Sequence, residues 1–292
     1  MTGPTITGTT TLLGIIGYPV EHSLSPPMQN AAIAHLGLNY VFLPFPVAPD
    51  RLADALRGFE AFGVRGFNAT IPHKQAIIPL LQSVSDTARA IGAVNTIYRT
   101  DTGWCGTNTD IIGFLSPLKR QMGWTNGATV VLGNGGAARA VVAGCAQMEC
   151  TQVQVVGRNP EKLQAFLASW EHSPLKANLT VHTWDELPTL LPQAKLVVNT
   201  TPVGMYPNVA TSPLTLEQWA MTPMDCIAYD LIYTPSPTLF LQQAQARGAI
   251  AIDGQEMLVQ QGAAALELWI DAPAPTDIMG QALRQALEQR LV

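Results

Sequence analysis

A strand that runs into a glycine-rich turn and then a helix constrains the fold of this chain most. Residues Ala128 to Leu132 form a short run rich in β-branched side chains, and Gly133-Asn134-Gly135-Gly136-Ala137-Ala138 follows directly. The spacing Gly-x-Gly-x-x-Ala is the dinucleotide-binding fingerprint with alanine in the third place. The glycines allow a tight turn and a close backbone approach to a pyrophosphate, which the helix N-terminus stabilises. The sequence therefore predicts an α/β domain that binds a dinucleotide through residues 133–137.

The end of the next expected strand predicts which dinucleotide is bound. Residues 152–156 form that strand, and Gly157-Arg158-Asn159-Pro160 follows it. An acidic residue here would bind the ribose 2′-hydroxyl of NAD, whereas a basic residue accommodates the 2′-phosphate of NADP. Arg158 therefore favours NADP, with Asn159 and Lys162 as helpers. The alternative is that Arg158 is only an exposed arginine at a helix start.

Strand and helix patterns alternate along most of the chain, which predicts an α/β fold with a parallel sheet covered by helices on both faces. We expect strands near residues 12–17, 40–46, 66–69, 128–132, 152–156, 179–183, 196–199, 226–230 and 249–252, and a hairpin over 95–104. A composition break at 123–127 predicts two domains. These are an α/β substrate domain over 1–122 and a Rossmann-type dinucleotide domain over 123–254, with helices of 255–292 packing back on the first domain.

Small polar residues follow the expected strands of the first domain. The segment Gly66 to Lys74 reads as a strand end, a polar turn and a helix start, with Pro72 suited to the first helical turn. Ligands bind beyond the carboxyl ends of strands in open α/β sheets. Hydroxyl, amide and charged groups at such ends suit a polyhydroxylated carboxylate. The residues concerned are Ser23, Ser25, Asn68, Thr70, Lys74, Asn95 and Asp110.

Composition excludes several other classes of protein. The chain has 292 residues, of which 47% are hydrophobic and 13% charged, and its net charge is −5. It carries no basic run, so we expect no nucleic-acid partner, and no apolar run is long enough for a membrane span. The four cysteines form no C-x-x-C pair and the histidines no H-x-x-x-H, so we expect reduced thiols, no metal and a cytoplasmic location. Homodimer formation is left open.

Seven motifs together resemble the shikimate dehydrogenase family. In chain order they are Ser23-Leu24-Ser25-Pro26, Asn68-Ala69-Thr70-Ile71-Pro72-His73-Lys74, Gly92-Ala93-Val94-Asn95-Thr96, Asn108-Thr109-Asp110, Gly133-Asn134-Gly135-Gly136-Ala137-Ala138-Arg139, Asn199-Thr200-Thr201-Pro202-Val203-Gly204-Met205 and Tyr229-Asp230-Leu231-Ile232-Tyr233. The resemblance implies NADPH-dependent reduction of 3-dehydroshikimate to shikimate, on the route to chorismate and the aromatic amino acids. Two positions depart from the family pattern: Asn134 replaces the commoner alanine, and Gly157-Arg158-Asn159 replaces Asn-Arg-Thr.

The resemblance also implies roles for individual residues. Lys74 and Asp110 would be the catalytic pair. Substrate would be bound by Ser23, Ser25, Thr70, Asn95, Tyr233 and Gln261. Beyond the residues already named, the cofactor side would include Asp86, Thr201, Leu231 and Gly254. Read without the family, Lys74 could be a surface lysine, Asp110 and Ser25 could be helix caps, and Asn95 could satisfy a turn.

Other functions are compatible with the same motifs. A quinate or dual quinate/shikimate dehydrogenase would share nearly all of them. A non-catalytic NADP-sensing protein could share the fold, although the intact Lys74 and Asp110 argue against it. A reductase with the same two-domain plan that acts on a folate or an acyl group is a third alternative.

Overall fold

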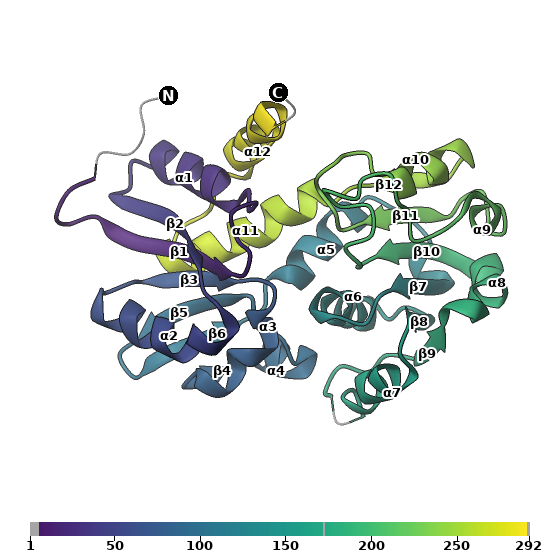
Figure 1. The fold of residues 1–292 in the computed structure, drawn as a ribbon, viewed down its shortest axis with the longest axis horizontal. Coiled ribbons are helices and arrows are strands. Elements are labelled where there is room, and N and C mark those ends of the chain that lie inside the picture. The colour runs from purple at the N-terminus through teal and green to yellow at the C-terminus, as the bar shows by residue number, and fades with distance from the viewer. Residues whose placement is uncertain (1–5, 172, 291–292) are drawn as a thin grey trace. The chain divides into compact units, whose positions relative to one another are not determined.

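Each half of the chain is built on its own six-stranded sheet in the computed structural model, which describes residues 6–171 and 173–290 (Figure 1). Unit 1 comprises residues 1–113 and 258–292, and unit 2 comprises residues 114–257. The divisions fall inside helices α5 (Asp110–Leu118) and α11 (Gln255–Ile270). The sequence predicted them at 122/123, from a composition break, and at 254/255, from two final helices with no strand between them.

The sheet of unit 1 is mixed, with the strand order β2-β1-β3-β5-β6-β4. Its strands are β1 (Thr11–Gly17), β2 (Tyr40–Pro46), β3 (Gly66–Ala69), β4 (Ser83–Val84), β5 (Thr96–Thr100) and β6 (Gly103–Thr107). Strand β1 is parallel to β2 and β3, whereas β5 is antiparallel to β3 and β6. The N–H of Tyr18 donates to the carbonyl of Ile71 at 3.0 Å. The turns after β1 and β3 therefore lie side by side at one edge of the sheet.

Helices cover both faces of this sheet. The helices of unit 1, besides its shares of α5 and α11, are α1 (Ser25–His35), α2 (Leu52–Ala61), α3 (His73–Ala76), α4 (Asp86–Ile91) and α12 (Thr276–Arg290). Phe45 of β2 packs on Phe59 of α2, while Phe42 of the same strand packs on Trp269 of α11. Neighbouring strand residues alternate between faces. Helices α2 and α11 therefore bury opposite faces, and α12 packs against α1.

The outer edge of β2 is closed to further strands. The N–H of Val47 donates to β1, so the even-numbered residues of β2 turn their backbone groups outward. Of these, Pro44 and Pro46 have no N–H to offer. The Asn30 amide accepts from the N–H of Phe42 and donates to its carbonyl, both at 2.9 Å. An incoming strand would have to displace Asn30, which protects this edge against sheet extension.

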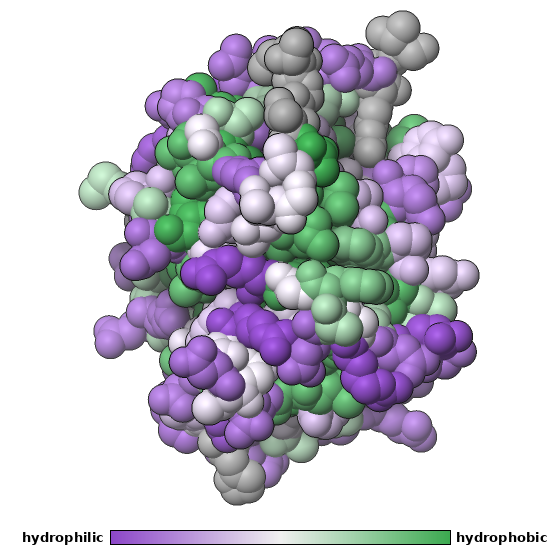
Figure 2. All heavy atoms as spheres, turned by 90° about the vertical axis from the view of Figure 1, so that its left-hand side faces the viewer, coloured by the Kyte–Doolittle hydropathy of each residue, from purple (hydrophilic) through white to green (hydrophobic). Residues whose placement is uncertain are grey.

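Figure 2 shows the left-hand side of Figure 1, with hydrophobic residues in the middle of the face and hydrophilic residues around them. The exposed apolar side chains of unit 1 include Leu36, Leu43 and Phe62. Leu43 belongs to β2, so the strand whose outer backbone groups are blocked also carries an exposed apolar side chain. Contacts made by this face therefore depend on side chains rather than on strand pairing.

The sheet of unit 2 is wholly parallel, with the strand order β12-β11-β10-β7-β8-β9. Its strands are β7 (Ala128–Leu132), β8 (Gln152–Gly157), β9 (Leu179–Thr183), β10 (Ala194–Asn199), β11 (Ile227–Asp230) and β12 (Ile250–Ile252). The order reverses between β7 and β10, which is the doubly wound arrangement that binds dinucleotides at the reversal. This confirms the predicted parallel sheet and Rossmann-type fold.

Helices also cover both faces of the unit 2 sheet. The helices lying wholly within this unit are α6 (Gly136–Gln147), α7 (Pro160–Ala168), α8 (Leu187–Leu190), α9 (Leu216–Trp219) and α10 (Leu239–Ala246). Tyr229 of β11 stacks on Phe114 of α5, with ring centroids 5.5 Å apart. The neighbouring Ala228 lies in the cluster that contains Trp219 and Phe240, which come from α9 and the start of α10. Alternate residues of one strand thus serve two separate apolar layers.

Two local predictions have different outcomes. The hairpin predicted over 95–104 is confirmed, because β5 pairs with β6 across the turn at Asp101 and Thr102. The expectation that Ser25 caps α1 is wrong, because the helix begins at Ser25 with Leu24 as its N-cap and no side-chain cap. A Ser25 cap would accept from residue 27 or 28, but Pro27 has no N–H and the N–H of Met28 donates to the Leu24 carbonyl at 3.4 Å.

No helix among the described residues is long and apolar enough to cross a membrane.

Gly66 should be the least replaceable glycine of the unit 1 core. A Cβ at this position would lie 2.2 Å from the Trp269 indole nitrogen, whose N–H donates to the Ile97 carbonyl at 2.9 Å. Gly66→Ala should therefore lower the free energy of unfolding by about 1–3 kcal/mol through overpacking. Gly58→Ala, inside α2 with only Phe62 at 3.9 Å, should instead stabilise by about 0.5–1 kcal/mol. Urea unfolding of both variants checks this, and a neutral Gly66→Ala would contradict the packing described.

Candidate functional site

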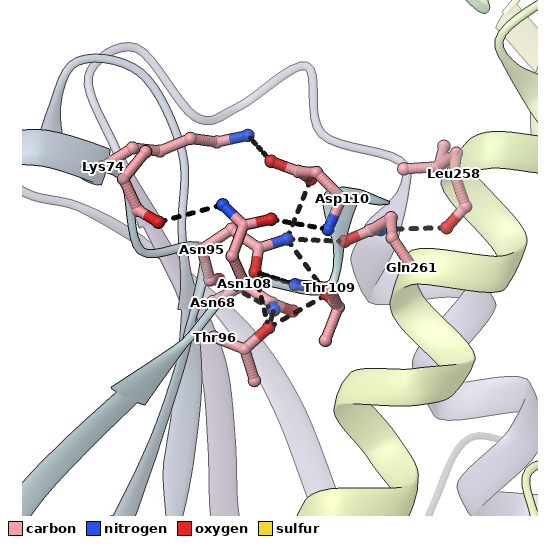
Figure 3. A network of polar contacts seen from close by, with 10 residues as sticks. Asn68, Lys74, Asn95, Thr96, Asn108, Thr109, Asp110, Leu258 and Gln261 are labelled. Atoms are coloured by element: carbon pink, nitrogen blue, oxygen red, sulfur yellow. Dashed lines mark hydrogen bonds and ion pairs between the residues drawn. The ribbon is translucent and has the colours of Figure 1, made fainter. Parts of the chain in front are cut away.

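Polar side chains from separate segments of unit 1 meet in one hydrogen-bonded network (Figure 3). They come from β3 and from α3 after it, from the start of β5 and the residue before it, from the turn between β6 and α5 with the first residue of α5, and from α11. The network contains Asn68, Lys74, Asn95, Thr96, Asn108, Thr109, Asp110 and Gln261. Four of the seven residues predicted from the sequence at strand ends, Asn68, Lys74, Asn95 and Asp110, are thus neighbours in space.

Lys74 and Asp110 form an ion pair at the centre of this network. The Lys74 Nζ donates to Asp110 Oδ2 at 2.7 Å, and the side chains are only 19% and 6% exposed. A charge-assisted hydrogen bond screened this little by water is stronger than a surface ion pair. The backbone holds Lys74 in place, since its carbonyl accepts from the N–H of Val94 at 2.7 Å. Lys74 keeps the larger exposed fraction, so its ammonium is the group of the pair that a ligand can reach.

Asn95 holds the other oxygen of the Asp110 carboxylate. The Nδ2 of Asn95 donates to Asp110 Oδ1 at 2.8 Å and to Thr109 Oγ1 at 3.0 Å. Its Oδ1 accepts from the Thr109 N–H at 2.8 Å, which fixes the orientation of the amide because only oxygen can accept. Asn95 is 2% exposed. Its side chain is thus largely committed to the Asp110 turn.

Three further residues support this arrangement, Asn68, Thr96 and Asn108, and of these only Asn68 was named as a candidate from the sequence. Asn68 donates to the Asn95 carbonyl at 3.0 Å and to the Thr96 hydroxyl at 3.1 Å. Asn108 Oδ1 accepts from the Asp110 N–H at 2.9 Å, and its Nδ2 donates to the Ala93 carbonyl at 3.0 Å. The dense polar run that ends in Asp110, between a strand and a helix, was the available signal for Asn108.

Gln261 of α11 lies beside the same amide. Its Oε1 accepts from Asn95 Nδ2 at 3.4 Å, and its own Nε2 donates to the Leu258 carbonyl at 2.8 Å. The first of these bonds is long, so it fixes Gln261 only weakly. Of the neighbouring glutamines 260 and 261, it is Gln261 that contacts the network.

The other expected substrate residues lie at other positions in the two units. Ser23 accepts from the N–H of Ser25 at 3.2 Å, at the start of α1. Thr70 follows β3, and its N–H donates to the Ile16 carbonyl at 2.9 Å. Tyr233 lies in unit 2, in the loop after β11, and is half-buried.

The glycine turn of unit 2 has the geometry that a pyrophosphate needs. Gly133 has φ +107°, and a Cβ there would lie 2.6 Å from the Thr200 hydroxyl. At Gly135 an added Cβ would meet nothing within 4 Å, so the backbone faces open space. Helix α6 starts at Gly136 without a side-chain cap. The N–H groups of its first turn are therefore available to an anion, and Asn134 and Ala137 lie half-buried beside them.

The residues expected to bind the 2′-phosphate follow β8 and are exposed. Asn159 is the N-cap of α7, because its Oδ1 accepts from the Lys162 N–H at 3.0 Å. Its acceptor is therefore occupied by the helix. Arg158 precedes this cap and presents its guanidinium to solvent, which suits a phosphate.

The other expected cofactor residues lie in different places. Thr201 follows β10 and donates its hydroxyl to Asn199 Oδ1 at 2.7 Å. Gly254 is buried against the loop after β11, where an added Cβ would lie 2.3 Å from the Leu231 carbonyl oxygen. Asp86 is exposed in the first turn of α4, in unit 1 rather than in the dinucleotide unit.

Arg139, the last residue of the glycine motif, packs inside unit 2. Its guanidinium lies over the rings of Phe166 and Trp170, 5.2 and 5.7 Å from their centroids, and donates to the Ser169 hydroxyl at 2.9 Å. Burial lowers the pKa of Arg139. These contacts join α6 to α7, so Arg139 serves the packing of the dinucleotide unit.

The described residues contain no cluster of three or more His, Cys, Asp or Glu side chains that could hold a metal ion. The four cysteines are free and buried.

Comparison with known proteins gives one consistent result. Residues 15–97 match the family description "Shikimate dehydrogenase substrate binding domain", and residues 254–284 match "Shikimate 5'-dehydrogenase C-terminal domain". A protein of Trichormus variabilis named shikimate dehydrogenase (NADP(+)) is 60% identical over 97% of this chain and 99% of its own length.

Solved structures agree with the sequence matches. A shikimate dehydrogenase crystallised in complex with NADP+ has a TM-score of 0.90 and 36% identity, over 98% of both chains. The Thermus thermophilus enzyme in complex with NADP(H) and shikimate has a TM-score of 0.80 and 34% identity, over 95% of this chain and 100% of that one.

Asn95→Asp should reveal how tightly the amide is bound into the network. The substitution keeps the acceptor for Thr109 but puts a second carboxylate oxygen where Nδ2 stands 2.8 Å from Asp110. We expect a loss of about 1–3 kcal/mol in the free energy of unfolding near pH 8, and a smaller loss near pH 5, where two facing carboxylates can share a proton. Urea titrations at both pH values, with the exposed Asn39→Asp as control, measure this. An equal loss at both pH values would contradict it.

Proposed function

Since the chain belongs to the shikimate dehydrogenase family, whose relatives are named as NADP-dependent, we propose that it reduces 3-dehydroshikimate to shikimate with NADPH. The observation that carries the proposal is the shielded Lys74–Asp110 ion pair, at 2.7 Å, at the carboxyl edge of the unit 1 sheet. A protein that only sensed NADP would have no use for a reachable ammonium held in this way. We assign substrate binding to unit 1 and cofactor binding to unit 2.

Lys74 is the proposed proton donor. NADPH, when bound, supplies the hydride to the ketone carbon. The ketone oxygen then gains negative charge and needs a proton, which the Lys74 ammonium donates. Before transfer, the same ammonium stabilises the developing charge on that oxygen. The Asp110 carboxylate, 2.7 Å away, directs the Lys74 Nζ through a charge-assisted hydrogen bond.

The neighbouring residues are proposed to bind the hydroxyl and carboxylate groups of the substrate. Ser23, Ser25 and Thr70 offer hydroxyls that can donate to a carboxylate or a hydroxyl group. The Asp110 carboxylate and the Gln261 amide offer acceptors and donors to the ring hydroxyls. Asn95 and Tyr233 are proposed as further substrate contacts.

The dinucleotide unit fits NADPH by its donor groups. The open backbone at Gly135 and the uncapped start of α6 suit the pyrophosphate. The exposed guanidinium of Arg158 suits the 2′-phosphate, and Lys162 adds a second cation nearby in the sequence. Thr201, Leu231 and Gly254 belong to the loops after β10, β11 and β12, on the other side of β7. We propose these loops for the nicotinamide half, and Asp86 as a further cofactor contact.

Replacing Lys74 should separate chemistry from binding. Lys74→Met keeps the length of the side chain but removes the proton donor, so kcat for 3-dehydroshikimate reduction should fall by about 100- to 10,000-fold. The KM for 3-dehydroshikimate should change little, because other residues hold the substrate. Steady-state kinetics measure both, with the exposed Lys119→Met as control. A Lys74→Met enzyme with unchanged kcat would exclude this role.

Replacing Arg158 should affect only the phosphorylated cofactor. Arg158→Ala removes a charge-assisted contact to the 2′-phosphate, so the KM for NADPH should rise about tenfold or more. The KM for NADH should stay the same, because NADH lacks that phosphate. Arg247→Ala, an exposed arginine elsewhere in unit 2, is the control. Equal changes with NADPH and NADH would show that Arg158 does not bind the phosphate.

A further inference from the structure

The unit 2 sheet holds its own buried carboxylate, Asp230, at the end of β11. The side chain is fully buried, and three donors surround it. Asn199 Nδ2 and the Ile232 N–H donate to Oδ1 at 3.0 and 3.1 Å, and the Thr238 hydroxyl donates to Oδ2 at 2.6 Å. Asn199 belongs to the end of β10, whereas Ile232 and Thr238 belong to the loop after β11. One carboxylate therefore joins two segments that are distant in the sequence.

The first of these segments is the loop after β10. Asn199 shapes it, because Oδ1 accepts from the N–H and the hydroxyl of Thr201 at 3.0 and 2.7 Å. Asn199 Nδ2 also donates to the Val203 carbonyl at 3.2 Å. Since Asp230 binds the same Nδ2, it fixes the side chain on which this loop is folded.

The second segment carries Leu231 and Tyr233. Asp230 fixes Ile232, which lies between them, and the Ile232 carbonyl accepts from the Gly254 N–H at 3.1 Å. Gly254 has no room for a Cβ against Leu231. Asp253 accepts from the hydroxyl of Ser236 in the same loop. The loop after β11 is thus held by backbone contacts and by two carboxylates.

Both loops leave the sheet at its carboxyl edge, on the β10 and β11 side of β7. A dinucleotide lies across the reversal in strand order, with its adenosine half toward β8, where Arg158 stands. Its nicotinamide half then falls to the loops after β10 and β11. We propose that Asp230 is the positioning residue of the nicotinamide site, because it sets both loops at once. This assignment rests on the proposed function.

Asp230 also has the electrostatics of a group that works in its ionised form. Burial, and to a smaller extent Asp253 after β12, raise the pKa of Asp230 to about 6 against the lowering effect of its three hydrogen bonds. The other groups facing it, Asn199 from β10 and Thr238 before α10, are neutral. At neutral pH the carboxylate is ionised and accepts from all three donors. Protonation, or an asparagine in its place, leaves fewer acceptor sites for the same donors.

Stability and loop order should therefore respond to pH in opposite directions. Because the folded pKa lies above the value of about 3.9 expected for an unfolded aspartate, the contribution of Asp230 to stability is full below about pH 4. It is lost as the pH rises through about 6. The hydrogen bonds that order the loops are complete only above that pH. If Asp230 were a purely structural residue, NADPH binding would change with pH in the same direction as the free energy of unfolding.

The test compares wild type, Asp230→Asn and the core variant Leu187→Ala near pH 5 and near pH 8. Nicotinamide fluorescence gives the NADPH affinity, steady-state assays give kcat/KM, and urea unfolding gives stability. Asp230→Asn should weaken NADPH binding about tenfold near pH 8 and little near pH 5, since a hydrogen bond to a charged group is lost only at the higher pH. Its stability deficit should be smaller near pH 8 than near pH 5. Leu187→Ala, buried in α8, should lose stability without this pH-dependent change in affinity.

A second variant keeps the test decisive if Asp230→Asn folds poorly. Thr238→Val removes one donor to Asp230 and should weaken NADPH binding several-fold near pH 8, less near pH 5. Equal affinity losses at both pH values, or the same pattern in Leu187→Ala, would overturn the positioning role. The variants can show this pH-dependent loss of NADPH affinity while the wild-type protein does not reduce 3-dehydroshikimate. That result would overturn the proposed function and leave the role of Asp230 standing. If the wild-type protein turns over normally and Asp230→Asn leaves the NADPH affinity unchanged, the role of Asp230 is wrong and the proposed function stands.

Discussion

The unit 1 site depends on the Asp110 carboxylate, because each of its oxygens is held by a different residue. Oδ2 accepts from Lys74 and Oδ1 from Asn95, at 2.7 and 2.8 Å. Asn95 is in turn fixed by the Thr109 N–H, so the position of the charge is set by the backbone of the turn before α5. Removing any one of these partners leaves a buried polar group unsatisfied, which costs more than the bond contributes. This coupling keeps the ammonium of Lys74 directed while part of it stays exposed.

Unit 2 uses a buried carboxylate in a similar way, with a different result. Asp230 ends strand β11 and accepts from two side-chain donors and one backbone donor, but no cation accompanies it among the described residues. Burial then dominates and raises its pKa to about 6, which makes its charge sensitive to pH. In unit 1 the carboxylate directs a reactive group, whereas in unit 2 it orders two loops. In both units the rigid sheet edge supplies the geometry, and the chemistry is added by residues just beyond it.

The sequence predicted the features that depend on local patterns. The glycine turn after β7 and the β5–β6 hairpin follow from residues adjacent in the chain, and both are found. The motif order also led to the correct family. The supporting role of Asn108 was missed, because its partners become neighbours only after folding. Ser25 was misread as a cap, because a serine followed by a proline is typical of a helix start, whereas the helix begins one residue earlier with Leu24 as its N-cap. Strand β4 has two residues, too few for any periodicity to register.

The most direct test of this account is the substrate and cofactor preference of the wild-type protein. Oxidation of NADPH and NADH is followed by absorbance with 3-dehydroshikimate and, separately, with 3-dehydroquinate. The arrangement of Lys74 and Asp110 in unit 1 and of Arg158 in unit 2 predicts that the highest kcat/KM belongs to NADPH with 3-dehydroshikimate. A higher kcat/KM with NADH and 3-dehydroquinate, or no oxidation of NADPH with either ketone, would contradict it.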